Sequence, residues 1–167
     1  MKLFFISTGR CGTNRIVEIL RKKLPQDYVV VHQMRWSRLA NVIGNLQLKF
    51  NKLNFLKKYL YRFIISPLDV KNHFISADPL TSLIIPEEII KDPNVKIVHI
   101  VRDEESFARS MLSFSRSNIK SFLAHGFVPF WQPGILPLEN FIRSNILNKY
   151  KKACFYKNIF FADFYSA

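Results

Sequence analysis

The sequence predicts an α/β fold, in which helices flank a parallel sheet. Short apolar runs alternate with helix-like patterns, residues 3–31 form a strand–helix–strand unit, and the strongest strand pattern, at 95–101, leads directly into another helix pattern. Strands that alternate with helices form parallel sheets with right-handed crossovers. The chain has 167 residues, so we expect a single domain over residues 1–167.

The first unit is well marked. Residues 3–6 form a short apolar run bounded by turn residues, which is typical of a buried parallel strand. Residues 13–24 have apolar side chains at helical spacing, with basic residues in the last turn and Pro25 as the stop. Residues 28–31 form the second strand, which completes a βαβ unit.

The middle of the chain, residues 34–65, has a helical period and many basic side chains. We interpret it as a helical insertion or cap on the α/β domain. A short strand is predicted at 74–76, and a short helix at 86–90 begins with proline in its first turn.

The second half begins with the β-branched run at 95–101, which predicts a strand buried on both faces. A helix is predicted at 104–115, followed by a loop at 126–137 that is rich in proline and aromatic residues. A further helix at 138–150 and a last strand at 159–161 complete the prediction.

Composition limits the function classes. The net charge of +13 favours a polyanionic partner: nucleic acid, an anionic membrane surface or a small phosphorylated ligand. The apolar runs are too short for a membrane span or a signal peptide. Two cysteines and four scattered histidines have neither disulfide nor zinc spacing, so we expect a cytoplasmic protein without a metal site.

The junction between the first strand and the first helix has the outline of an anion-binding loop. Glycines allow the backbone to approach a ligand closely, and the helix start adds N–H donors and positive potential. The spacing matches neither a Walker loop, because no lysine follows Gly12, nor a three-glycine dinucleotide fingerprint. A cysteine-phosphatase loop is also disfavoured, because Arg15 is too close to Cys11. The residues assigned to this first loop are Gly9, Arg10, Cys11, Gly12, Thr13 and Asn14.

The stretch after the 95–101 strand predicts a second anion site. Arg102 stands at the carboxyl end of the strand, which is the ligand side of a parallel sheet, and Ser110 follows eight residues later. A guanidinium offers a rigid fork that suits phosphate.

Together, the two elements resemble the sulfotransferase family that uses 3'-phosphoadenosine-5'-phosphosulfate (PAPS). That family opens with strand, [KR]-[ST]-G-T loop and helix, which here reads Arg10-Cys11-Gly12-Thr13. Its second element is a strand, an arginine and a serine eight residues later, which here are Arg102 and Ser110. The resemblance implies a P-loop sulfotransferase-like fold, with the first loop on the 5'-phosphosulfate and the second element on the 3'-phosphate. Many members have lysine at the position of Arg10, whereas arginine supplies charge and hydrogen bonds but no proton.

The resemblance further implies metal-free transfer of a sulfuryl group from PAPS to a hydroxyl or amine, with Arg10 as a catalytic residue. A general base is needed. His32, just after the second strand, is the first candidate, and Asp78, before the Arg102 strand, is the second. His99 is expected to be a core residue, while His73 and His125 have no argument beyond their residue type.

The acceptor is expected to be a small molecule or a glycan, with Trp36, Phe130 and Trp131 available to stack on a sugar ring. Two alternatives remain. One is a P-loop phosphoryl-transfer enzyme, which the missing Gly-Lys disfavours. The other is a basic nucleic-acid-binding domain, which the lack of a recognised binding motif and the spread of charge along the chain disfavour.

Overall fold

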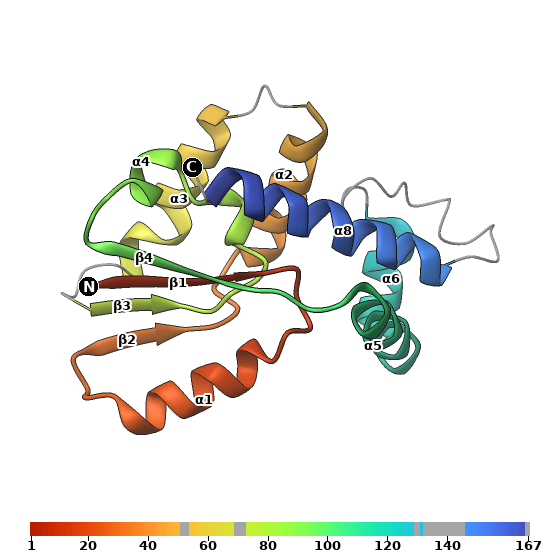
Figure 1. Ribbon diagram of the computed structural model, residues 1–167, viewed down its shortest axis with the longest axis horizontal. Coiled ribbons are helices and arrows are strands. Elements are labelled where there is room, and N and C mark those ends of the chain that lie inside the picture. The colour runs from red at the N-terminus through yellow and green to blue at the C-terminus, as the bar shows by residue number, and fades with distance from the viewer. Residues whose placement is uncertain (51–53, 69–72, 129–130, 132–145, 166–167) are drawn as a thin grey trace.

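The computed structural model describes residues 1–50, 54–68, 73–128, 131 and 146–165. At its centre is a four-stranded parallel sheet in the order β2–β3–β1–β4 (Figure 1). Its strands are β1 (Lys2–Ser7), β2 (Tyr28–Val31), β3 (His73–Ser76) and β4 (Val95–Ile100). The predicted α/β class, with a parallel sheet and flanking helices, is confirmed.

Strand order places the two predicted anion elements next to each other. β1 pairs with both β3 and β4, and Ser7 at the end of β1 lies opposite Ile100 at the end of β4. Because parallel strands end at the same edge of a sheet, the segments that follow β1 and β4 leave this edge side by side.

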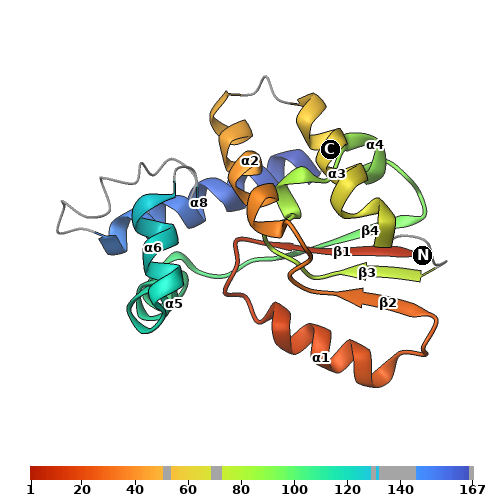
Figure 2. The same ribbon diagram turned by 180° about the vertical axis from the view of Figure 1, so that it is seen from behind.

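The helices are α1 (Thr13–Lys23), α2 (Ser37–Phe50), α3 (Asn54–Ile64), α4 (Glu87–Ile90), α5 (Glu104–Ser117), α6 (Ile119–Phe127) and α8 (Ile146–Tyr165), with 3₁₀ turns at Ser66–Leu68 and Ser82–Ile84. In both ribbon views α1 covers one face of the sheet, whereas α2, α3, α4 and the end of α8 cover the other (Figures 1 and 2). None of the helices in the described part of the chain is both long and apolar enough to cross a membrane.

The main core fills the space between the sheet and the larger helical layer. The described part of the predicted helical segment 34–65 contains α2 and α3, which lie directly on the sheet and contribute Ala40, Leu60 and Ile64 to this core. On the opposite face, Val17 of α1 packs against Val30 of β2.

The predicted strand at 159–161 is wrong, because these residues belong to α8. Phe161 is 1% exposed while Ile159 is 42% exposed, so the apolar run faces two environments. A short apolar run fits a strand and a buried helix equally well. The buried residues of α8 have helical spacing and are Tyr150, Ala153, Cys154, Lys157 and Phe161.

The prediction that residues 95–101 are buried on both faces is also wrong. The strand itself is confirmed as β4, but Val98 is 41% exposed and Lys96 is also exposed. The reason is topological: β4 is an edge strand, and the apolar cluster beneath the sheet joins α1 to β1, β2 and β3.

A second apolar cluster lies beyond the carboxyl edge of the sheet, where α5 packs against the first half of α8 (Figure 1). Its buried members include Phe107 and Met111 of α5 and Tyr150 of α8. The Ser115 and Tyr150 hydroxyls are 3.1 Å apart within it. Of the predicted loop at 126–137, the first two residues end α6, and of the predicted helix at 138–150, the last five residues begin α8; residues 129–130 and 132–145 lie outside the described part.

Candidate functional site

The first loop connects β1 to α1 through a backbone that turns into the left-handed region three times. The φ angles of Gly9, Arg10 and Gly12 are 95°, 56° and 76°. Glycine adopts this conformation at little cost, whereas a non-glycine residue such as Arg10 is held there by its surroundings. Such turns direct backbone N–H groups into a common concavity that suits an anion.

The start of α1 adds positive potential that no side chain of the helix neutralises. Gly12 is the N-cap, no side chain caps the helix, and its first turn has no acidic residue. The first N–H groups of a helix lack intrahelical partners, so they are available to an anionic ligand.

The beginning of α5 differs in this respect. Asp103 caps it by accepting a hydrogen bond from the Ser106 N–H at 2.8 Å, and Glu104 and Glu105 occupy its first turn. This hydrogen bond is the main reason why the pKa of Asp103 is lowered. One N–H group of the α5 terminus is therefore capped and the first turn is acidic, so the positive charge of this segment comes from the Arg102 side chain.

The structure brings Arg10, Arg102 and Ser110 together. Arg102 donates a hydrogen bond from Nη1 to the carbonyl oxygen of Arg10, and Arg10 donates from Nε to Ser110 Oγ at 3.2 Å. The Arg10 guanidinium also lies over the ring of Phe114, 4.5 Å from its centroid, in a cation–π contact. Two elements that are about a hundred residues apart in the sequence thus form one cationic site.

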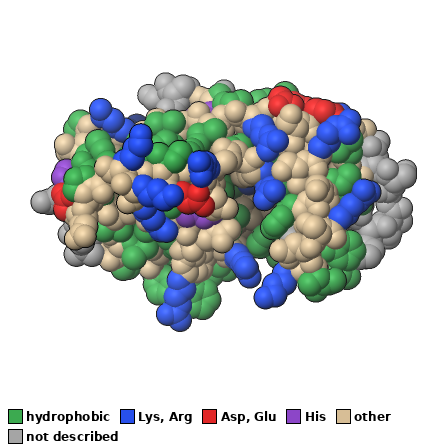
Figure 3. All heavy atoms as spheres, turned by 90° about the horizontal axis from the view of Figure 1, so that it is seen from below, with side chains coloured by type: hydrophobic (Ala, Val, Ile, Leu, Met, Phe, Trp, Pro, Cys, Tyr) green, Lys and Arg blue, Asp and Glu red, His purple; other side chains and the backbone are tan. Residues whose placement is uncertain are grey.

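One face of the molecule is hollowed. Seen from below, the molecule is hollowed between the part built by the sheet and α1 and the part built by α5 and α6, with Lys and Arg side chains around the hollow (Figure 3). Arg10 is exposed and Arg102 is partly buried, so both remain accessible to a ligand.

Behind the first loop, α8 contacts both anion elements. Cys11 of the loop donates from Sγ to the Gly9 carbonyl at 3.0 Å and lies 3.7 Å from Thr8 Oγ1. Cys154 of α8 donates from Sγ to the Arg102 carbonyl at 3.7 Å. Burial raises the pKa of Cys154 to about 11, partly offset by a hydrogen bond from Thr8. Cys154 is therefore a neutral packing residue at physiological pH.

His32 follows β2 in the sequence, and its side chain contacts Thr13, the first residue of α1. Its Nε2 is 3.1 Å from Thr13 Oγ1. Burial lowers the pKa of His32 below its ordinary value, the negative charge of Asp78 opposes this shift, and Arg21 reinforces it. This shift favours the neutral imidazole, which is the form of histidine that can accept a proton.

Asp78 has a different environment. It is 1% exposed, and its Oδ2 accepts hydrogen bonds from the Met34 N–H at 3.0 Å and from the Ser37 hydroxyl. Its Oδ1 accepts from the Leu80 N–H at 3.0 Å. Both carboxylate oxygens hold backbone in place, so the geometry favours His32 over Asp78 as the base and gives Asp78 the role of fixing the segment that follows His32.

Replacing Asp78 by alanine is expected to lower the free energy of unfolding by about 3 kcal/mol, because buried donors at Met34, Ser37 and Leu80 lose their acceptor. Urea denaturation measures this. Asp92→Ala is the matched control: Asp92 accepts one exposed bond from the Asn94 N–H at 2.9 Å, so the expected loss is below about 1 kcal/mol. If both variants lost the same free energy of unfolding, Asp78 would not have this structural role.

Of the other residues considered in the sequence, Asn14 lies beside the site, and the remaining ones lie away from it or outside the described residues. His73 lies at the amino end of β3, whereas the site lies at the carboxyl ends of the strands. Its ring stacks on the ring of Tyr28, with centroids 4.5 Å apart. His99 was predicted to be a core residue but is only partly buried; its ring packs edge-on against the Phe161 ring, with centroids 5.2 Å apart. Asn14 is exposed in the first turn of α1. The His125 side chain and Phe130 fall outside the described part of the structure.

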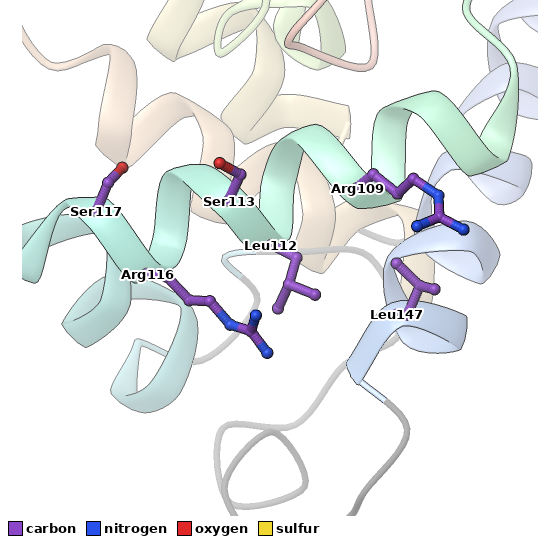
Figure 4. A pocket seen from close by; sticks show the side chains of 6 residues that line it. All are labelled: Arg109, Leu112, Ser113, Arg116, Ser117 and Leu147. Carbon is purple, nitrogen blue, oxygen red and sulfur yellow. The ribbon is translucent and has the colours of Figure 1, made fainter.

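A separate hollow of about 550 Å³ lies between α5 and α8 (Figure 4). Leu147 lines it from α8, and the lining residues of α5 are Arg109, Leu112, Ser113, Arg116 and Ser117. None of the predicted site residues is among them, so this hollow is distinct from the cationic site.

Sequence reasoning missed the contribution of α8 and of Phe114 to the site. If residues 146–165 had been interpreted as one helix, the helical spacing of positions such as Cys154 and Lys157 would have indicated that α8 packs against the sheet and the site.

In the described residues, no group of three or more His, Cys, Asp or Glu side chains is arranged to hold a metal ion. Comparisons of the chain with models of protein families, with curated proteins and with solved structures found no match.

Proposed function

We propose that this protein binds PAPS and transfers its sulfuryl group to a hydroxyl or amine acceptor. The observation that carries the proposal is the junction of Arg10, Arg102 and Ser110, where Arg102 donates to the Arg10 carbonyl and Arg10 donates to Ser110. A nucleotide with anionic groups at two positions of its ribose needs cationic groups from two neighbouring elements, and this junction supplies them.

In this proposal the first loop binds the 5'-phosphosulfate. The uncapped N–H groups of α1 supply donors, the left-handed turns at Gly9 and Gly12 shape the loop, and Arg10 supplies charge. Negative charge grows on the oxygen that stays with the phosphate as the sulfuryl group departs. Donors already fixed around this oxygen stabilise the transition state without reorganising.

Arg102 and Ser110 bind the 3'-phosphate. The guanidinium has five N–H donors, of which Nη1 holds the Arg10 carbonyl, so others can meet phosphate oxygens. The same bond couples the two elements, because a shift of Arg102 displaces the Arg10 backbone.

His32 acts as the general base. It accepts the proton of the acceptor hydroxyl or amine while the acceptor oxygen or nitrogen forms a bond to sulfur. The bond between sulfur and the bridging oxygen breaks, and that oxygen leaves with its electron pair as part of 3'-phosphoadenosine-5'-phosphate. The Thr13 hydroxyl, 3.1 Å from Nε2, orients the imidazole.

The acceptor enters beside the turn that follows His32. Trp36 in this turn is 49% exposed, and the Arg35 guanidinium lies 5.5 Å from its ring centroid. An exposed aromatic ring next to a cation suits an acidic saccharide or another ring-containing acceptor.

Binding measurements test the proposal. Calorimetry with 3'-phosphoadenosine-5'-phosphate, with ATP–Mg²⁺ and with an oligonucleotide should show metal-independent binding of the first ligand in preference to the other two. Preference for ATP–Mg²⁺ would identify a phosphoryl-transfer enzyme instead, and preference for the oligonucleotide would identify a nucleic-acid-binding protein.

Replacing His32 by glutamine is expected to leave the affinity for 3'-phosphoadenosine-5'-phosphate within about 2-fold of wild type, while the transfer rate falls about 100-fold or more. In the wild type only the neutral imidazole is active. Because burial lowers the pKa of His32 below its ordinary value, the acid limb of the pH–rate profile should lie at lower pH than that of an exposed histidine. This acid limb should be absent from the residual activity of His32→Gln. An unchanged rate and pH profile in the variant would exclude His32 as the base.

A further inference from the structure

Lys157 has an unusual position for a lysine. It lies on the buried face of α8 between Cys154 and Phe161, and only 3% of it is exposed. Lysine is almost never fully buried unless its charge is compensated. Both ribbon views place the middle of α8 next to the carboxyl ends of β1 and β4, where the two anion elements begin (Figures 1 and 2).

Lys57 provides a comparison within the same chain. Lys57 of α3 is also 3% exposed, and burial lowers the pKa of each of these two lysines to about 8. The charges of Glu87 and Glu88 act on Lys57 and partly offset this cost. In the described part of the chain no carboxylate acts on Lys157 in this way; the ionisable groups that act on it are the thiols of Cys154 and Cys11.

These two cysteines connect Lys157 to both halves of the cationic site. Cys11 belongs to the first loop, where it contacts Thr8 and the Gly9 carbonyl. Cys154 contacts the carbonyl of Arg102. Lys157 is therefore a buried lysine that is close enough to the Cys11 and Cys154 thiols to interact with them electrostatically.

We infer that Lys157 is a binding residue of this site, whose ammonium supplies positive charge from behind the first loop to a phosphate or sulfate group held there. This inference deepens the proposed function and rests on its anion site. A buried cation without a counter-charge destabilises a protein, and a bound anion would supply the missing charge. Groups with strongly perturbed pKa values next to a ligand loop are characteristic of functional sites.

The test compares Lys157→Met with Lys57→Met, because methionine keeps much of the apolar stem of lysine and removes only the charge. The probes are inorganic phosphate and 3'-phosphoadenosine-5'-phosphate, measured by calorimetry below pH 8. Lys157→Met should weaken the binding of both probes by about 10-fold and should not lower the melting temperature of the ligand-free protein. Lys57→Met should leave both affinities within about 2-fold of wild type.

The outcomes separate this inference from the proposed function. Wild-type affinity for both probes in Lys157→Met overturns the inference and leaves the proposed function standing. Loss of phosphate binding in Lys157→Met, in a protein that prefers ATP–Mg²⁺ or an oligonucleotide to 3'-phosphoadenosine-5'-phosphate, supports the inference and overturns the proposed function. A wild type that binds neither probe overturns both.

A measurement on the wild type covers the case in which Lys157→Met does not fold. The side-chain ¹⁵N resonance of Lys157 should titrate near pH 8 without ligand, while the neighbouring Cys154 thiol, with a pKa of about 11, stays neutral. Saturating phosphate should move the titration of Lys157 to higher pH, because an adjacent anion favours the charged form. The same titration with and without phosphate would contradict the inference.

Discussion

Replacing Arg102 by alanine is expected to weaken the binding of 3'-phosphoadenosine-5'-phosphate by about 10- to 100-fold. Hydrogen bonds to charged groups contribute about 1.5–3 kcal/mol, which corresponds to this range of affinity. Arg102 acts twice in the proposed site: it faces the 3'-phosphate, and it holds the Arg10 carbonyl through Nη1. Its loss therefore affects the 3'-phosphate directly and the first loop through the Arg10 backbone.

Two further variants make this result specific. Arg109→Ala removes the same charge from nearby α5, but Arg109 pairs with Glu105 at 2.7 Å and is 71% exposed, so its loss should change the affinity by less than about 2-fold. Arg102→Lys keeps the charge without the planar fork and should be intermediate. If all three variants bound equally well, Arg102 would have no place in the site.

Phe161→Ala is expected to lower the free energy of unfolding by about 3–5 kcal/mol, the range typical of a large aromatic residue removed from a core. Phe161 is 1% exposed and belongs to the main core together with Phe4 and Leu60. It also packs against His99 of β4, with ring centroids 5.2 Å apart. The variant would leave a cavity between α8 and the sheet, and urea denaturation measures the cost.

The matched control is Phe155→Ala in the same helix. Phe155 is 47% exposed and pairs with Tyr156 on the surface at 6.1 Å, so its removal should cost less than about 1 kcal/mol. This contrast is specific to a helix in which Phe161 faces the sheet and Phe155 faces solvent. A small cost for Phe161→Ala would show that α8 does not dock on the sheet.

The strands and their connecting helices could be predicted because their signals are local. In residues 1–31, turn residues bound each apolar run, and Pro25 marks the end of α1. The exposure of β4 could not be predicted in this way. Val98 is exposed because β4 is the edge strand and α1 packs beneath the other three, and strand order is a property of the whole chain.

The last helix shows the same limit. The run at 159–161 is apolar and β-prone, and periodicity over so few residues does not separate a strand from a buried helix. The outcome depends on packing, because α8 covers both the α5 cluster and the sheet with one continuous face.

For the candidate site, the sequence by itself determined the two elements that meet in it: a glycine-containing turn before a helix, and an arginine at the end of a strand. Only the tertiary structure decided that Arg102 and Ser110 both contact Arg10, because this requires β1 and β4 to be neighbours. It also decided that Asp78 accepts hydrogen bonds from backbone donors, and that burial lowers the pKa of His32 beside Thr13. The first loop has no lysine after Gly12, and the fold buries Lys157 of α8 near Cys11 of this loop. The tertiary structure decided these features because burial and the proximity of distant segments depend on the packing of the whole chain, which no local sequence pattern encodes.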